Sequence, residues 1–399
     1  MHSHTDLRGS RSAFNWSRAL WLALALAGCG GGVDSGGTGG TGASFASGSI
    51  TGFGSVIVNG VHFDDSSASV TDDTGAPRSR DELRLGMSTE IRGSAITIDA
   101  AGSNTATASS IAFGSEILGR VESIDLAGSQ LVVLGQTVET TPTTVFDDVS
   151  VSGGLPALAV GNVVEVYALF DAATGRYSAT RIERKGAVAA YRLRGLVSKL
   201  DTTAKAFNIG SERISYARLA GPAPASLANG SFVRVRLQTA KVGGVWVVAA
   251  LTDGVQQPRD LDDVRLEGLI SAFTSVTRFS VNGVTVDAGA VSPPAGLALG
   301  VRVEVEGTAS GGVLVATKVK IKTQGDMMNQ GFELRGPIAS VDAPNLSFVL
   351  RRETVRYSLG TTDFRNGTAA DLTPGVNVEA RGVLSADGTR LLATRITFK

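Results

Sequence analysis

The chain has 399 residues with 37 basic and 37 acidic side chains, and 43% of the residues are hydrophobic. A formal net charge of zero excludes the basic footprint typical of nucleic-acid-binding proteins, and a single cysteine excludes a disulfide within the chain. Fifty glycines against five tyrosines and three tryptophans favour many short strands joined by tight turns.

Residues 1–28 have the pattern of a lipoprotein signal peptide. Three arginines precede the apolar stretch 19–27, which is too short to span a bilayer. The run Leu26-Ala27-Gly28-Cys29 resembles a bacterial lipobox, which implies cleavage before Cys29 and acylation of that residue, including by palmitate. The alternative is an ordinary signal peptide or an uncleaved anchor, and the position of the lone cysteine favours the lipobox.

Gly30 follows the cysteine where an aspartate would favour retention in the inner membrane, and this resembles outer-membrane sorting. The resemblance therefore implies a lipid-anchored protein of the outer membrane, facing the periplasm or the cell surface. Acyl chains would supply the contact with the membrane without a transmembrane helix. Envelope proteins or glycans are the further partners to consider, and nucleic acid is not expected.

Residues 29–48 consist of the acylated cysteine and a stretch made almost wholly of Gly, Ser, Thr and Ala, which predicts a flexible tether with a reach of roughly 25 Å. The run 37–42 matches a dinucleotide-binding pattern by its letters. It follows no strand and opens no helix, so we interpret it as tether.

The rest of the chain is interpreted as five copies of one β unit, with a period of about 70 residues. Residues 264–322 show the unit most clearly, as runs of alternating apolar and polar residues bounded by Gly, Pro, Ser or Asn. The predicted copies span 49–116, 117–188, 189–261, 262–328 and 329–399.

Three landmarks recur in constant order within these copies. The first is a glycine in the opening strand, at Gly119, Gly195, Gly268 and Gly336, while the first copy begins differently, with Gly52 and Gly54. The second is a glycine before a Val-rich central strand, at Gly86, Gly161, Gly230, Gly300 and Gly375. The third is a closing strand that begins with two small residues, as in Ala316-Thr317.

The order of strands in each copy resembles an OB-fold. A leucine about three residues before the second landmark glycine is placed to plug the bottom of a small barrel, and the glycine of the opening strand would let that strand bend around the closure. We therefore expect an all-β chain of about five small OB-like barrels. A generic β-sandwich is the alternative.

The run at residues 50–60, Ile-Thr-Gly-Phe-Gly-Ser-Val-Ile-Val-Asn-Gly, together with the lipobox and the tandem copies, resembles a group of bacterial lipoproteins. Their repeat is a β-rich domain of unknown function. The resemblance covers nearly all of the mature chain and implies no catalytic residue, cofactor or ligand.

Few residues capable of catalysis are left after signal cleavage. His62 is then the one histidine, and it lies in a predicted strand, so the sequence indicates no Ser-His-Asp, Cys-His or multi-histidine zinc site. Three acidic pairs could serve a glycosidase: Asp64-Asp65, Asp72-Asp73 and Asp147-Asp148. Their Ser/Thr/Gly-rich surroundings favour aspartates that hydrogen-bond to the backbone of turns. A weak calcium site in the first copy is the alternative interpretation.

Trp246 is the one tryptophan outside the signal segment, and its apolar neighbours favour a core position over an exposed stacking platform. No metal, cofactor or catalytic residue is therefore predicted.

Two classes of function remain open. The first is a non-catalytic envelope scaffold or binding surface, and the second is a polysaccharide-binding protein or hydrolase.

A register is also predicted for the hairpin of the central and closing strands. If residues 311, 387 and 173 are the hairpin centres, then Glu304 faces Lys318, Glu379 faces Arg395 and Glu165 faces Arg181. Each hairpin would then have a charged face and an apolar face. The third copy has Arg234 at the Glu position, so a different or irregular hairpin is expected there.

Overall fold

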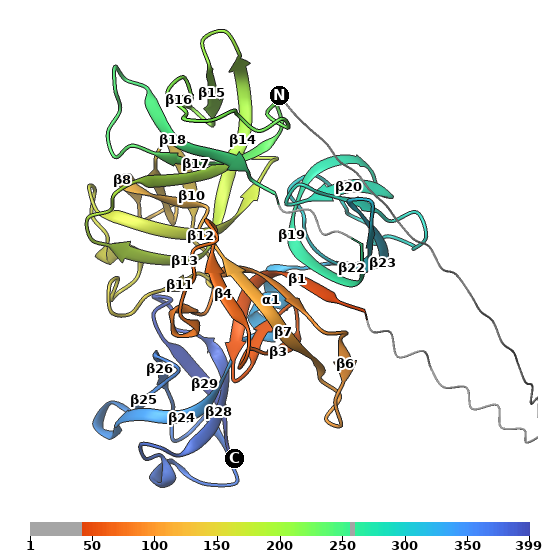
Figure 1. Ribbon diagram of the computed structural model, residues 1–399. Coiled ribbons are helices and arrows are strands. Elements are labelled where there is room, and N and C mark those ends of the chain that lie inside the picture. The colour runs from red at the N-terminus through yellow and green to blue at the C-terminus, as the bar shows by residue number, and fades with distance from the viewer. Residues whose placement is uncertain (1–41, 256–259) are drawn as a thin grey trace, which may run out of the picture. The chain divides into compact units, whose positions relative to one another are not determined.

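The structure is a computed structural model that describes residues 42–255 and 260–399 (Figure 1). Nearly all of the regular structure in these ranges is β-strand, and α1 (Gln324–Gln330) is the one α-helix among them. The signal segment, the lipobox with Cys29 and most of the predicted tether lie outside the described residues.

Barrel 4, residues 261–321, shows how each unit closes. Its strands are β19 (Leu261–Ser275), β20 (Arg278–Val281), β21 (Val284–Asp287), β22 (Arg302–Ser310) and β23 (Val313–Ile321). Antiparallel pairs join β19 to β20, β20 to β21, β23 to β22 and β22 to β19, while β21 and β23 are parallel. The ring is closed, with the strand order of an OB-fold, so the expected small barrel is confirmed and the sandwich is not.

The other four barrels close in the same order. Barrel 1 (residues 44–113) contains β1 (Ser44–Phe53), β2 (Val56–Val58), β3 (Val61–Asp64), β4 (Ser69–Asp72), η1 (Arg80–Glu82), β5 (Ser88–Gly93), β6 (Thr97–Ile98) and β7 (Asn104–Phe113). Barrel 2 (residues 117–185) contains β8 (Ile117–Asp125), β9 (Gln130–Val133), β10 (Gln136–Glu139), β11 (Val145–Phe146), η2 (Leu155–Ala157), β12 (Val163–Asp171) and β13 (Arg176–Lys185).

Barrel 3 (residues 191–253) contains β14 (Tyr191–Asp201), β15 (Ala206–Ile209), β16 (Glu212–Ser215), β17 (Phe232–Leu237) and β18 (Trp246–Asp253). Barrel 5 (residues 332–398) contains β24 (Phe332–Asp342), η3 (Ala343–Asn345), β25 (Ser347–Leu350), β26 (Glu353–Arg356), β27 (Asp363–Arg365), η4 (Ala369–Asp371), β28 (Asn377–Leu384) and β29 (Leu391–Phe398).

The glycine before each central strand has one conformation in all five barrels. Gly86, Gly161, Gly230, Gly300 and Gly375 have φ between 79° and 89°, a region that L side chains rarely adopt. Each donates its N–H to a carbonyl of the opening strand at 2.8–2.9 Å, as Gly300 does to Ile270. These glycines therefore begin the pairing that closes the barrel, and the leucine plug predicted before them is buried at Leu83, Leu158, Leu297 and Leu372.

Barrel 1 begins earlier than predicted. In barrel 4, a side chain on Gly268 would meet Asn282 of the β20–β21 turn, and in barrel 1 a side chain on Gly48 would meet Asn59 of the β2–β3 turn. Gly48 is thus the opening-strand landmark that the sequence did not identify. The tether prediction is wrong for residues 44–48, because they form the first half of β1 and Phe45 and Ala46 are almost fully buried.

The predicted hairpin register is wrong by two residues. One residue arises at the turn, since Ser310 faces Val313 and the hairpin is centred between residues 311 and 312, and the other arises because each closing strand carries a β-bulge. In barrel 4 Glu304 faces Lys320, not Lys318, and the pairing shifts after Glu306. Corresponding shifts occur in the β5–β7, β12–β13, β17–β18 and β28–β29 pairs. The extra residue is the second small residue of the third landmark, and Thr317, Thr394 and Ser109 each donate their hydroxyl to a carbonyl of the facing strand at 3.1 Å. Barrel 3 shares this bulge, and the irregular hairpin expected there is confirmed, because the ladder stops at Leu237 and Val248 and the isolated bridge between Val242 and Val245 is out of step with it.

The recurring glutamate of the central strand nevertheless forms an ion pair with the closing strand or the residue after it. In barrels 2, 4 and 5 its partner is a lysine four residues beyond the predicted one: Glu304–Lys322 at 3.0 Å, Glu165–Lys185 at 2.9 Å and Glu379–Lys399 at 2.7 Å. The turn centre, the bulge and a diagonal contact together account for the offset. The structural role predicted for these glutamates is confirmed, with corrected partners.

Strand β1 joins three barrels. It closes barrel 1 with β5, pairs in parallel with β19 of barrel 4 over residues 44–47, and pairs in parallel with β24 of barrel 5 at Gly52 and Phe53. Barrels 2 and 3 are joined by an antiparallel pair between β8 and β14. The described barrels therefore do not follow one another as independent units.

Candidate functional site

The first two predicted acidic pairs are used in turns and ion pairs. Asp64 accepts the Ser66 N–H at 3.0 Å, and Asp65 lies 3.6 Å from Arg80. Asp72 accepts hydrogen bonds from Thr74 and Arg78, and although burial alone would raise its pKa, these bonds lower the pKa to about 2. The turn interpretation is confirmed for Asp64 and Asp72.

The third acidic pair, Asp147-Asp148, caps a turn in barrel 2 and contacts barrel 5. Asp147 accepts the Ser150 N–H at 2.8 Å and lies 3.1 Å from Arg181. Asp148 accepts the hydroxyl of Thr354 in barrel 5 at 2.5 Å. Among the described residues no group of three or more His, Cys, Asp or Glu side chains is placed to hold a metal ion.

His62 and Trp246 lie where the sequence suggested. His62 is in β3, with its Nδ1 3.4 Å from the Ser55 hydroxyl. Trp246 is 6% exposed and packs edge-on against Tyr191 in the core of barrel 3. All five tyrosines are buried as well, so the described residues present none of the Tyr or Trp platforms that sugar or base stacking would need.

Buried arginines form ion pairs and hydrogen bonds that join barrels 1, 2, 3 and 5. The side chain of Arg181 in β13 is 0% exposed. It contacts Glu183 at 2.6 Å, the Leu85 carbonyl of barrel 1 at 3.1 Å and Glu353 of barrel 5 at 3.7 Å. A buried cation needs such partners, because removal from water costs several kcal/mol per ion.

Two arginines of β14 extend this charged joint. Arg192 lies 2.9 Å from Asp73 of barrel 1 and also pairs with Glu165 of barrel 2. Arg194 pairs at 2.9 Å with Glu116, which precedes β8, and donates to the Asn282 carbonyl of barrel 4 at 3.4 Å. The arginines therefore link barrel 3 to barrels 1, 2 and 4.

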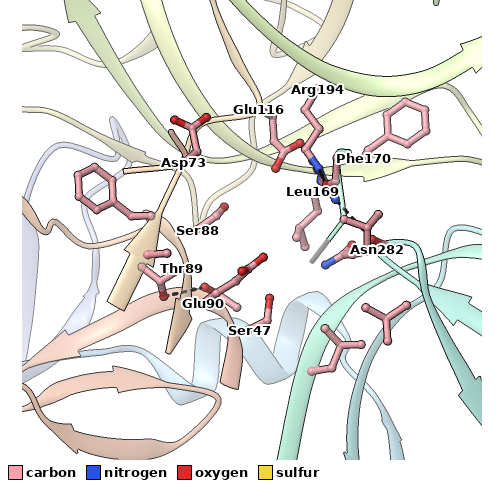
Figure 2. Close-up of a pocket in the computed structure, with 18 of the residues that line it drawn as sticks. Ser47, Asp73, Ser88, Thr89, Glu90, Glu116, Leu169, Phe170, Arg194 and Asn282 are labelled. Carbon is pink, nitrogen blue, oxygen red and sulfur yellow. Dashed lines mark hydrogen bonds and ion pairs between the residues drawn. The ribbon is translucent and has the colours of Figure 1, made fainter. Parts of the chain in front are cut away.

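A cavity of about 90 Å³ lies where barrels 1, 2, 3 and 4 meet (Figure 2). Its wall includes Glu90 of β5, Glu116, Arg194 and Arg234, with Phe45 and Phe170 among the apolar residues. Figure 2 shows Glu90 projecting into the space across from Glu116 and Arg194. Burial raises the pKa of Glu90, while the charges of Arg194 and Arg234 oppose this effect.

Glu90 occupies the strand position of Glu304, Glu165 and Glu379, but its environment differs. The place of their lysine is taken in barrel 1 by Gly114, which has no side chain. No ion pair joins Glu90 to any of the described residues. Sequence reasoning missed this carboxyl, although aligning the central strands would have shown a glutamate that lacks the recurring lysine.

The volume of the cavity limits its chemistry. About 90 Å³ is well below the roughly 300–1,000 Å³ of usual small-molecule sites. Glu90 and Glu116 therefore have no room for a sugar ring between them in this structure.

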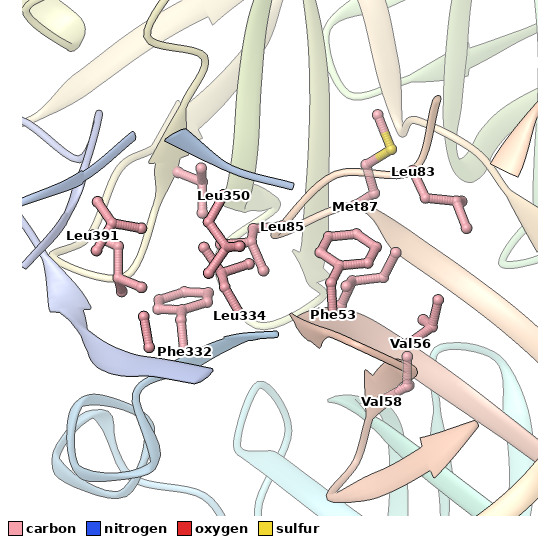
Figure 3. Packing of buried hydrophobic residues seen from close by; sticks show 14 of the residues in the cluster. Phe53, Val56, Val58, Leu83, Leu85, Met87, Phe332, Leu334, Leu350 and Leu391 are labelled. Carbon is pink, nitrogen blue, oxygen red and sulfur yellow. The ribbon is translucent and has the colours of Figure 1, made fainter. Parts of the chain in front are cut away.

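The joint between barrels 1 and 5 is apolar (Figure 3). Phe53, Val56 and Met87 of barrel 1 belong to the same core cluster as Phe332 and Leu334 of barrel 5. This continuous core accompanies the parallel pairing of β1 with β24.

No helix among the described residues is long and apolar enough to cross a membrane. Cys29 lies outside those residues, so its acylation stays a prediction.

Comparisons with known proteins bear on the domain more than on its activity. No curated protein matches the chain. A solved structure described as drosophila Unr CSD456 is 14% identical, with 53% of this chain and 98% of that chain covered, but its TM-score of 0.13 is too low to inform on fold or function. The model of DUF5666, a domain of unknown function, matches residues 119–183, 267–320 and 335–397. These segments lie in barrels 2, 4 and 5, so three of the five barrels match that uncharacterised domain and the other two share its strand order here.

Proposed function

We propose that the chain is a non-catalytic, lipid-anchored envelope protein whose barrels serve as a scaffold and binding surface. The observation that carries this proposal is the use of its charged residues. The described acidic pairs cap turns or join barrels. The cavity lined by Glu90, which forms no ion pair with the described residues, has a volume of only about 90 Å³. The carboxylates that could act in catalysis therefore stabilise turns and the contacts between barrels.

The membrane part of the proposal rests on Leu26-Ala27-Gly28-Cys29 at the end of the apolar segment. The anchor would be the acylated Cys29, in the outer membrane. Labelled palmitate should enter the wild-type protein and fractionate with outer membranes, whereas Cys29→Ser should yield unlabelled, unprocessed protein. Failure of the wild type to take up label would remove the anchor from the proposal.

The alternative is a polysaccharide-binding protein or hydrolase that uses a carboxylate pair. The full-length protein should release no new reducing ends from envelope polysaccharides, and Glu90→Gln and Glu116→Gln should behave like the wild type. Hydrolysis by the wild type that is lost in either variant would instead establish a catalytic role for the cavity. Saturable, salt-resistant binding to one sugar class without hydrolysis would keep the scaffold and name its ligand.

A further inference from the structure

A second hollow, of about 470 Å³, is lined by two arginines that form no ion pair within 4.0 Å with the described residues. Arg84 precedes Gly86 in barrel 1, and Arg352 lies in the β25–β26 turn of barrel 5. The acidic residues of the same wall, Asp72, Glu82, Asp147, Glu165 and Glu183, each have a cationic partner within 4.0 Å. Neither Arg84 nor Arg352 forms an ion pair with any described residue.

The backbone at Arg352 is unusual for this turn. Three of the four equivalent two-residue turns place a glycine with positive φ at the second position, namely Gly60, Gly135 and Gly283, while the barrel 3 turn is Gly210-Ser211. Barrel 5 has Arg351 and Arg352 there, with φ of 53° and 66°. Arg351 fills the space beside Gly336 and donates to the Arg335 carbonyl at 2.9 Å, so it has a structural role.

No such role accounts for Arg352, which is exposed and donates no hydrogen bond to the described residues. A non-glycine residue held at positive φ stores strain, and such positions are often found at binding sites. Position 352 therefore carries an arginine although its backbone conformation favours glycine.

The two guanidinium groups also repel one another. Burial lowers the pKa of Arg84 and the positive charge of Arg352 lowers it further, while the carboxylates of Glu353 and Glu183 oppose these effects. Nη1 of Arg84 donates to the carbonyls of Asp81 and Leu83, at 2.5 and 2.7 Å. These hydrogen bonds hold the guanidinium group in place and leave its Nε and Nη2 for a ligand. An anion between the two arginines would relieve the repulsion and accept from both.

We propose that Arg84 and Arg352 form a binding site for a phosphate monoester, carried by a saccharide or by a lipid head group. A doubly charged, tetrahedral group with three free oxygens can accept hydrogen bonds from two guanidinium groups that line one hollow. The hollow has space for the sugar or glycerol that bears the phosphate. The site does not depend on the proposed function, because an unacylated chain would retain both arginines.

The test is calorimetric titration of the full-length protein at pH 7.5 with inorganic phosphate and with glucose 6-phosphate. A third arm compares binding to phosphatidylcholine vesicles with and without phosphatidic acid. Saturable binding in at least one arm is expected, weakened tenfold or more in Arg352→Gly and in Arg84→Gln. Preference for glucose 6-phosphate would identify a saccharide source, and preference for phosphatidic acid a lipid source.

Arg352→Gly separates binding from folding, because glycine suits the positive φ and the melting temperature should be no lower than that of the wild type. Lys205→Gly is the matched control: it also removes a cation from positive φ, at 49°, but lies in barrel 3 away from the hollow. It should bind like the wild type. Absence of saturable binding in every arm, unaltered affinity in Arg352→Gly, or an equal loss in Lys205→Gly would overturn the site.

Discussion

The joint between barrels 1 and 5 and the joint around Arg181 bring barrels together by opposite means. The first continues one apolar core across two barrels, with Leu334 0% exposed. The second buries a guanidinium group among Glu183, Asp147 and Glu353. Apolar burial stabilises roughly in proportion to area, whereas a buried ion pair recovers little more than its own desolvation cost. The apolar joint should therefore supply cohesion, and the charged joint should mainly select which surfaces meet.

The largest effect is expected from a charge placed in the apolar joint. Leu334→Asp would bury an unpaired carboxylate in the shared core of barrels 1 and 5, and should destabilise the chain by more than about 4 kcal/mol. Urea unfolding followed by circular dichroism would measure the loss. Leu392→Asp is the control, because Leu392 in the same barrel is 38% exposed and its variant should lie within about 1 kcal/mol of the wild type. Equal effects of the two would refute the shared core.

Removal of the buried arginine should rank second. Arg181→Met would leave Glu183, Asp147 and Glu353 without their common cation, at a cost of about 3–5 kcal/mol. Arg395 occupies the same landmark position in barrel 5, is 51% exposed and pairs with Asp363 at 3.1 Å. Arg395→Met should cost at most about 1 kcal/mol in the same denaturation assay. A small loss for Arg181→Met would mean that the charged joint does not form as described.

Acid should weaken the charged joint selectively. Burial alone would raise the pKa of Glu183, but the charges of Arg181 and Lys185 outweigh burial and lower the pKa from 4.5 to about 2. Because the folded-state pKa is depressed, its stabilisation is present above about pH 4.5 and disappears as the pH falls through about 2. The contribution is roughly 3 kcal/mol.

Unfolding free energies measured between pH 6 and pH 2 would check this. The decline should be shallower in Glu183→Gln, which cannot titrate at that position, while Glu122→Gln serves as an exposed control. Identical slopes for the wild type and Glu183→Gln would contradict the assignment.

The smallest effects concern the β22–β23 hairpin. Glu306 pairs with Lys318 at 2.7 Å, and because Lys318 is 60% exposed, Glu306→Ala should cost about 0.2–1 kcal/mol. Glu304→Ala should cost more, about 1–3 kcal/mol, because it deprives the 6% exposed Lys322 of its carboxylate. Comparing the two thermal melts would test the corrected register. A loss for Glu304→Ala no larger than that for Glu306→Ala would contradict the pairing of Glu304 with the buried Lys322.

Local features of this chain could be predicted because their causes are local. A glycine at positive φ, as at Gly300, and a plug such as Leu297 work within one barrel, so they recur in each copy at the same spacing. Alternation of apolar and polar residues likewise reports strands and their inward faces. The sequence by itself therefore determined the repeat, the β class and the small barrel.

Pairings between distant segments could not be predicted in this way. The bulge at Thr317 shifts a register by one residue without altering the alternation on either side of it, and β1 meets β19 and β24 across more than two hundred residues. The outward polar residues of a strand have the same pattern whether they face water or a neighbouring barrel. Only the tertiary structure decided that Arg181 is buried, that Arg395 at the equivalent position is exposed, and that Glu90 faces a cavity, because the packing of whole barrels places those side chains.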